Sequence, residues 1–161
     1  MEGQKTKRAG ISGEKAKPSR LPPTTVDLPL TAYISEEYVS DLNTRLGLYQ
    51  GLAKVDRTEQ IEAMAQEFAD RFGAPPPEVR NLLYALRIKI LASKAGIESI
   101  STEDRQIVLR RFQGMRFDKQ QLEPYLREGI TIGHAQLRLS LKQLGKEWRK
   151  VLEGVLGRIN A

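Results

Sequence analysis

The chain contains no cysteine and a single histidine, His134. The lack of thiols excludes disulfides, thiolate zinc sites and a cysteine nucleophile, and one histidine cannot supply a two-histidine metal site. A cysteine-free chain suits a reducing compartment, so we expect a cytoplasmic location. No segment reaches the ~20 consecutive apolar residues of a transmembrane helix, and residues 1–25 lack the apolar core of a signal peptide. We therefore expect no membrane partner.

Motifs for nucleotide or acyl chemistry are also missing. A phosphate-binding loop requires Ser or Thr after its Gly-Lys, whereas Gly145-Lys146 is followed by Glu147. A Ser-His-Asp triad is arithmetically possible, but His134 lies in a strand pattern with no nucleophile elbow, which favours a turn or strand histidine. The sequence predicts no catalytic residues, no metal and no cofactor.

Charge is unevenly distributed along the chain. Residues 1–25 contain six basic and two acidic side chains, residues 26–104 eight and thirteen, and residues 105–161 twelve and five. An acidic first half and a basic second half suit docking between oppositely charged surfaces as well as they suit nucleic acid. Residues 1–25, rich in Lys, Gly, Ser and Pro, are predicted to be a flexible basic linker, and residues 26–161 a folded domain.

The first half of the domain reads as helical. Residues 26–34 predict a short edge strand because Pro29 disfavours a central position. A helix follows from Ser35, with an inward stripe at three- and four-residue steps. A second helix has Asp56 and Glu59 at capping-box spacing and stops at Gly73. A third helix runs from Pro77 to about Gly96. The predicted inward stripe of the first helix is Val39, Leu42, Leu46, Tyr49 and Leu52/Ala53.

Shorter periods appear after Gly96. Residues 97–101 and 105–112 predict two strands around a turn at residues 102–104, residues 117–128 a short helix, and residues 130–141 a half-buried strand or hairpin. A last helix, residues 146–159, places Trp148 and five aliphatic residues on one stripe. The fold class is therefore α+β: a three-helix half, then a small, mostly antiparallel sheet with a C-terminal helix.

Two charged sets could serve function. Glu67 and Asp70 are neighbours on the second helix near its C-terminus, where both oppose the helix dipole and Arg71 offsets part of the cost. They suit either a solvated face or a protein partner's arginines, presented beside a rigid proline corner. A basic set could instead track a nucleic-acid backbone, although it is spread over several elements. The candidates in that set are Arg110, Arg111, Arg116, Lys146, Arg149 and Lys150.

Several motifs resemble the C-terminal domain of the bacterial transcription-repair coupling factor. The first is an acidic-hydrophobic entry strand, and the second is a helix with the motif Asn43-x-Arg45-Leu46-x-x-Tyr49. The third is a helix that ends in Asp70-Arg-Phe-Gly73 before a proline turn, and the fourth is Ala95-Gly-Ile97 at the entry to a strand. The resemblance covers about residues 26–161 and is strongest up to Ile100. The triple proline and the glycines Gly47 and Gly51 depart from the family pattern.

The resemblance implies a function. Members of that family are large ATP-dependent DNA translocases that displace stalled RNA polymerase and recruit nucleotide excision repair. ATP and Mg²⁺ bind in other domains, which are missing here. The resemblance implies that this module is regulatory: it packs on the parent's N-terminal domain, masks the surface for the excinuclease recognition subunit, and leaves contact with polymerase and DNA to the parent. Glu67, Asp70 and Arg71 are the expected interface residues, and a nucleic-acid-binding accessory module is the alternative.

Overall fold

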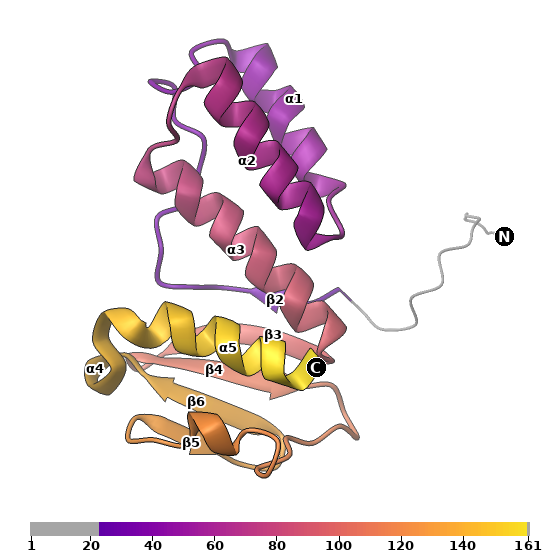
Figure 1. Ribbon diagram of the computed structural model, residues 1–161, viewed down its shortest axis with the longest axis vertical. Coiled ribbons are helices and arrows are strands. Elements are labelled where there is room, and N and C mark those ends of the chain that lie inside the picture. Colours follow the sequence, from indigo (N-terminus) through magenta and orange to yellow (C-terminus); the bar gives the residue numbers. More distant parts are fainter. Residues whose placement is uncertain (1–22, 161) are drawn as a thin grey trace, which may run out of the picture.

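The computed structural model describes residues 23–160. Three helices form one part, and a five-stranded sheet with a helix lying across one face forms the other (Figure 1). This arrangement confirms the predicted α+β class. The predicted linker, apart from its last three residues, lies outside the described residues. Of those three, Thr24 and Thr25 belong to the fold, since Thr24 is buried and its hydroxyl donates to the Ile97 carbonyl over 2.7 Å.

The predicted edge strand is much shorter than expected. Only β2 (Thr25–Val26) is a strand, and it pairs in parallel with β3 at the edge of the sheet. The chain after it runs to α1 without further strand, while Leu28 and Leu30 pack against the core. The edge position is therefore confirmed and the length is wrong.

Helix α1 (Leu42–Ala53) begins six residues later than predicted, because its N-cap is Asp41 and not Ser35. Ser35 begins only a single turn, in which its carbonyl accepts hydrogen bonds from the backbone N–H groups of Tyr38 and Val39. Asp41 then starts the true helix, because its carboxylate accepts from the Thr44 backbone N–H over 2.9 Å. The inward stripe is also wrong in part: Leu48 and Leu52 are buried, whereas Leu42, Leu46 and Tyr49 are exposed.

Helices α2 (Thr58–Phe72) and α3 (Pro77–Lys94) agree closely with the prediction. The capping residue of α2 differs, because the Gln60 side chain, not Glu59, accepts from the backbone N–H groups of Asp56 and Arg57. Gly73 ends α2 with a φ of 89°, a conformation that favours glycine. Pro77 opens α3, where its missing N–H costs no hydrogen bond.

The sheet has the order β2-β3-β4-β6-β5. Strands β3 (Ile97–Glu103) and β4 (Gln106–Arg111) form a hairpin closed by Asp104 and Arg105, both with positive φ. The turn therefore consists of residues 104–105 instead of the expected 102–104. Strands β5 (Ile130–Ile132) and β6 (Gln136–Ser140) form the expected second hairpin. Apart from the β2–β3 pair, all pairings are antiparallel.

The predicted helix over residues 117–128 is wrong. Only Glu123–Tyr125 forms a single 3₁₀ turn, since Pro124 provides no backbone N–H for a longer helix. The last helix is preceded by α4 (Leu141–Leu144) and a 3₁₀ turn (Gly145–Glu147), and α5 itself is Trp148–Asn160. Its buried stripe is confirmed, with Trp148, Val151, Leu152, Val155 and Leu156 facing the sheet.

Two apolar clusters form the core, and α3 belongs to both. Val79, Leu83 and Ile90 join the cluster of the three helices, while Ile88 and Ala92 join the cluster between the sheet and α5. Arg87 also links the two parts, because its Nε lies 2.9 Å from Glu153 Oε2 on α5 and its Nη1 3.7 Å from Glu62 Oε2 on α2. Helix α3 thus positions the exposed helices relative to the sheet.

Candidate functional site

The last two turns of α2 bring together the charged residues that the sequence singles out. Glu67, Asp70 and Arg71 are all exposed. Arg71 Nη1 donates to Glu67 Oε2 over 3.0 Å, and Gln66 Nε2 donates to Asp70 Oδ1 over 3.1 Å. Both carboxylates therefore have a partner on their own helix. An exposed pair of this kind contributes only about 0.3–0.5 kcal/mol, so exchanging it for a partner's side chain costs little.

Aromatic packing holds this charged face in place. The Arg71 guanidinium lies 4.8 Å from the centroid of the Phe72 ring. Phe72 in turn packs edge to face against Tyr38 and Phe68, with ring centroids 5.7 and 6.4 Å apart. The arginine is thus oriented by a cation–π contact as well as by Glu67.

The proline corner is fixed by hydrogen bonds to its carbonyl groups. The Tyr38 hydroxyl is within hydrogen-bonding distance of the Phe68 carbonyl, at 3.1 Å, and of the Gly73 carbonyl, at 2.7 Å. Across the turn, Arg80 Nη1 donates to the Pro75 carbonyl over 2.7 Å. The Tyr38 and Arg80 side chains thus bond to carbonyls at the end of α2 and in the turn after it, so α2 and α3 meet at a defined angle.

A hollow of about 420 Å³ lies beside the charged face, between α1 and α2. Gly47 and Gly51 form part of the α1 wall, and Glu67 and Arg71 part of the α2 wall. A Cβ at Gly47 would meet nothing within 4 Å, and one at Gly51 would only touch the end of Met64. The two glycines that depart from the family pattern therefore leave space next to the predicted interface residues.

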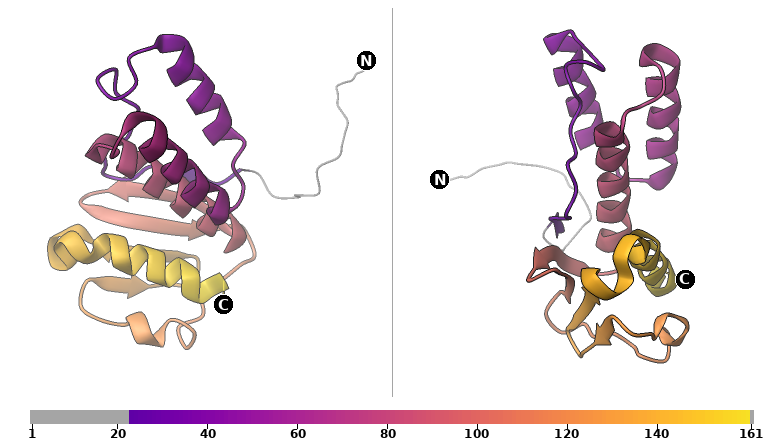
Figure 2. Two further views of the ribbon diagram at one scale, coloured as in Figure 1. Left: turned by 45° about the horizontal axis from the view of Figure 1, so that its top comes forward. Right: turned by 90° about the vertical axis from the view of Figure 1, so that its left-hand side faces the viewer.

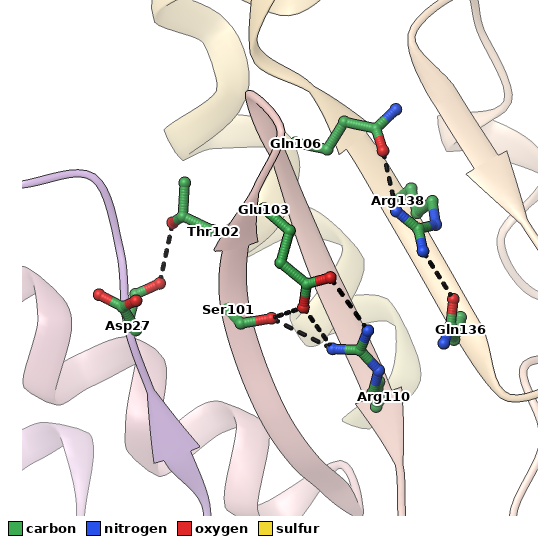
Figure 3. A network of polar contacts seen from close by, with 8 residues as sticks. All are labelled: Asp27, Ser101, Thr102, Glu103, Gln106, Arg110, Gln136 and Arg138. Atoms are coloured by element: carbon green, nitrogen blue, oxygen red, sulfur yellow. Dashed lines mark hydrogen bonds and ion pairs between the residues drawn. The ribbon is translucent and has the colours of Figure 1, made fainter.

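The basic residues of the second half are largely engaged within the fold. On the sheet face away from α5, Arg110 donates from Nη1 and Nη2 to the two oxygens of Glu103, over 2.7 and 3.2 Å (Figure 3). These bonds, with that from Ser101, lower the pKa of Glu103 to about 2. Arg111 donates to the carbonyls of Ala95 and Arg116, and burial lowers its pKa.

The remaining basic candidates do not form one patch with these two. Arg149 lies over the rings of Tyr84 and Trp148, 5.4 and 5.5 Å from their centroids. Lys146, Arg149 and Lys150 stand near α4, which contacts Arg105 just before β4, whereas Arg116 lies beyond the far end of β4. Figure 1 shows α4 and the loop after β4 at opposite ends of the sheet. The six cations therefore do not line a single groove.

One exposed apolar surface on α1 was not predicted from the sequence. Leu42, Leu46 and Tyr49 are 58%, 50% and 38% exposed on α1. Their helical spacing suggested a core stripe, but the buried side of the helix is the neighbouring one, which contains Leu48 and Leu52 and lies about 100° around the helix axis. The signal was available in the sequence of this helix, because its large apolar residues spread over a wider arc than the roughly 100° of one packing face.

Residues 23–160 lack the features of two other classes of site. This part of the chain contains no helix with the length and apolarity that a membrane span requires. Within the same residues, no three His, Asp or Glu side chains are grouped as a metal site would need. His134 is exposed in the bend between β5 and β6, as a turn histidine.

Comparison with known proteins places these features in a family. The TRCF domain model matches residues 28–122. The chain is 35% identical over 89 residues to a transcription-repair-coupling factor of Rickettsia bellii and 35% over 95 residues to one of Staphylococcus haemolyticus, covering 55% and 59% of this chain. The match spans only 8% of the length of either relative.

The fold has a counterpart among solved structures. The crystal structure of a C-terminal domain of transcription-repair coupling factor superposes with a TM-score of 0.71 at 22% identity. The alignment covers 86% of this chain and 89% of the other. That likeness concerns the fold, whereas the family match covers more than half of the sequence. The chain belongs to the TRCF domain family.

Proposed function

We propose that this domain is the regulatory module of a DNA translocase and represses it by docking on the N-terminal, excinuclease-recruiting domain of the same protein. The observation that carries the proposal is the exposed Glu67, Asp70 and Arg71 face on the rigid corner of a TRCF domain without a nucleotide motif. The docked domain would mask the surface for the excinuclease recognition subunit. ATP, Mg²⁺, DNA and stalled RNA polymerase would engage other parts of the parent.

The properties of the face suit a reversible contact. Within the described part of the chain, Glu67 and Asp70 bond only to partners on α2, and such exposed pairs exchange at small cost. A switch requires a gap of a few kcal/mol between its states, since a much larger one would leave it permanently closed. Charged contacts at a rigid mount supply specificity without such a large interface.

The test is the charge-reversed variant Glu67→Lys/Asp70→Lys in the full-length parent protein. We expect basal ATPase activity and binding of the excinuclease recognition subunit to rise, because the docked state loses its charge pairs. The melting temperature of the isolated 161-residue chain should change by less than about 4 °C, because surface substitutions usually shift stability by no more than ±0.5 kcal/mol.

A matched control is Glu98→Lys/Glu123→Lys. It makes the same change of net charge at two exposed residues of the sheet half. The control should leave both activities at the wild-type level. If the two double variants raise ATPase activity and subunit binding equally, the effect is due to net charge alone. If neither variant changes these activities, α2 is rejected as the docking face.

A further inference from the structure

An apolar surface on α1 continues into a groove against α3. Leu42, Leu46 and Tyr49 lie four and three residues apart, so they share one side of the helix. At the C-terminal end of this stripe, Tyr49 and Ala53 face Leu82 and Leu86 of α3 across a hollow of about 290 Å³. A second hollow of about 340 Å³ shares Leu52, Ala53 and Leu86 with the first. Three exposed large apolar side chains thus lead into one continuous groove.

This groove lies on the other side of α1 from the charged face of α2. At about 100° per residue, Gly47 and Gly51 point roughly opposite to Leu46 and Tyr49, and the two glycines face Glu67 and Arg71. The right view of Figure 2 shows α1 and α2 on either side of α3, with β2 on the side of α1. Val26 of β2 helps to line the groove. The surface is therefore separate from the proposed docking site.

The charge at the groove is positive. Among residues 23–160, Lys89 is the only charged side chain that lines the first hollow, and it is exposed. The second hollow adds Lys94 and Asp56. Asp56 already has the Arg57 guanidinium 3.7 Å away, and no ion pair joins either lysine to another residue of the described part. Lys94 is near enough to the Glu59 carboxylate to interact with it electrostatically, so Lys89 is the cation whose charge is available beside the apolar surface.

That charge argues against two of the three possible occupants. Residues 1–22 lead to Pro23, close to Val26, but they contain six Lys or Arg and only two Glu, the same sign as the groove. A symmetric contact with a second copy would bring the same patch, with its Lys89 and Lys94, against itself. A segment that carries carboxylates beside apolar side chains is complementary in both respects.

We infer that this groove binds an acidic amphipathic helix of another domain or protein. The apolar side chains of that helix fill the hollows between α1 and α3 and cover Leu46, while a carboxylate pairs with Lys89. This is the helix-in-groove mode of recognition, in which a few apolar anchors provide most of the affinity and the charges at the rim select the partner. The domain would then have two docking faces, one on each side of its helical half.

The experiment uses the 161-residue chain and two designed helical peptides as probes. Both peptides have Leu at positions i, i+3, i+4 and i+7; one carries Glu at the flanking positions and the other Lys. We expect fluorescence anisotropy to show at least tenfold tighter binding of the acidic peptide. Lys89→Glu should abolish or reverse that preference, and Leu46→Asp should weaken binding of the acidic peptide about tenfold or more. Lys142→Glu, at an exposed residue of α4, is the matched control and should change neither.

Other outcomes would overturn the inference. Equal affinity for the two peptides, absence of binding, or an unchanged preference in Lys89→Glu would remove the acidic helix as occupant. Concentration-dependent dimerisation that Leu46→Asp abolishes would assign the groove to a second copy. Tighter peptide binding after removal of residues 1–22 would assign it to that segment. Since Leu46 and Lys89 are exposed, circular dichroism should show all these variants folded as the wild type.

Discussion

The Tyr38 hydroxyl lies 2.7 Å from the carbonyl oxygen of Gly73, which ties the turn before α1 to the corner after α2. The same hydroxyl lies 3.1 Å from the Phe68 carbonyl, and the ring packs against Phe72. One side chain thus fixes the end of α2, the helix that presents Glu67, Asp70 and Arg71.

Removing that hydroxyl should loosen the corner. Tyr38→Phe keeps the ring contact with Phe72 but leaves the Gly73 carbonyl without its side-chain donor. We expect the free energy of unfolding, measured with urea, to fall by roughly 1 kcal/mol. Tyr33→Phe is the control, because Tyr33 is 45% exposed and its hydroxyl bonds to no other described residue. A loss of equal size in both variants would contradict the role of the Tyr38 bond.

Two glycines of α5 should respond in opposite ways to alanine. A Cβ at Gly154 would approach Tyr125 atoms to between 2.6 and 2.9 Å, whereas one at Gly157 would meet nothing within 4 Å. Gly154→Ala should therefore cost about 1–3 kcal/mol through overpacking. Gly157→Ala should stabilise the domain by about 0.5–1 kcal/mol through helix propensity. Chemical denaturation of the two variants provides the comparison, and a stabilising Gly154→Ala would show that Tyr125 moves away freely.

The ion pairs of Arg87 should differ in strength. Glu153 lies 2.9 Å from Arg87 and is 37% exposed, while Glu62 lies 3.7 Å away and is 75% exposed. Double-mutant cycles with Arg87→Gln, Glu153→Gln and Glu62→Gln should give a coupling of about 0.5–1 kcal/mol for Glu153 and less than about 0.3 kcal/mol for Glu62. The reverse order would mean that Arg87 is held by α2 instead of α5.

Stability should depend on pH through Glu103. Its pKa falls from 4.5 to about 2, first because Arg110 donates hydrogen bonds to the carboxylate and then because Ser101 does. A lowered carboxyl pKa stabilises the fold above the unfolded value, and this contribution disappears as the pH falls through the folded value. The stability difference between wild type and Glu103→Gln should therefore be largest above about pH 5 and should shrink between about pH 4.5 and pH 2.

Titration of the Glu103 carboxyl carbon by NMR gives a direct check. A midpoint near 2 is expected in the wild type, and Ser101→Ala should raise it because one donor is removed. A wild-type midpoint near 4.5 would show that the Arg110 pair does not form in solution.

Local signals in the sequence predicted most of the fold, and they failed where two signals competed. Gly73 and Pro77 marked the ends of α2 and α3 correctly, because each has a backbone requirement that few other residues meet. Ser35 and Asp41 are both good N-caps, and periodicity alone could not show that the second one starts α1. Pro124 reduced a predicted helix to one turn.

The candidate site was predictable in part. The spacing of Glu67, Asp70 and Arg71 placed them on one exposed face, and that placement is confirmed; their role in docking stays a prediction. Spacing could not reveal that Arg110 and Arg111 are tied to Glu103 and to backbone carbonyls, since those contacts depend on strand register. Nor could it tell which side of α1 faces solvent, because that depends on where α3 packs.

Helix α3 contributes side chains to both core clusters in alternation along a single rod. A displacement of α1 or α2 is therefore transmitted to the sheet by movement of α3, because α3 is one continuous helix from Pro77 to Lys94. Unfolding of one cluster would remove part of the packing of α3 and weaken the other cluster, so the two halves should unfold together in one transition. A partner that binds the three-helix part consequently affects the position of the whole domain.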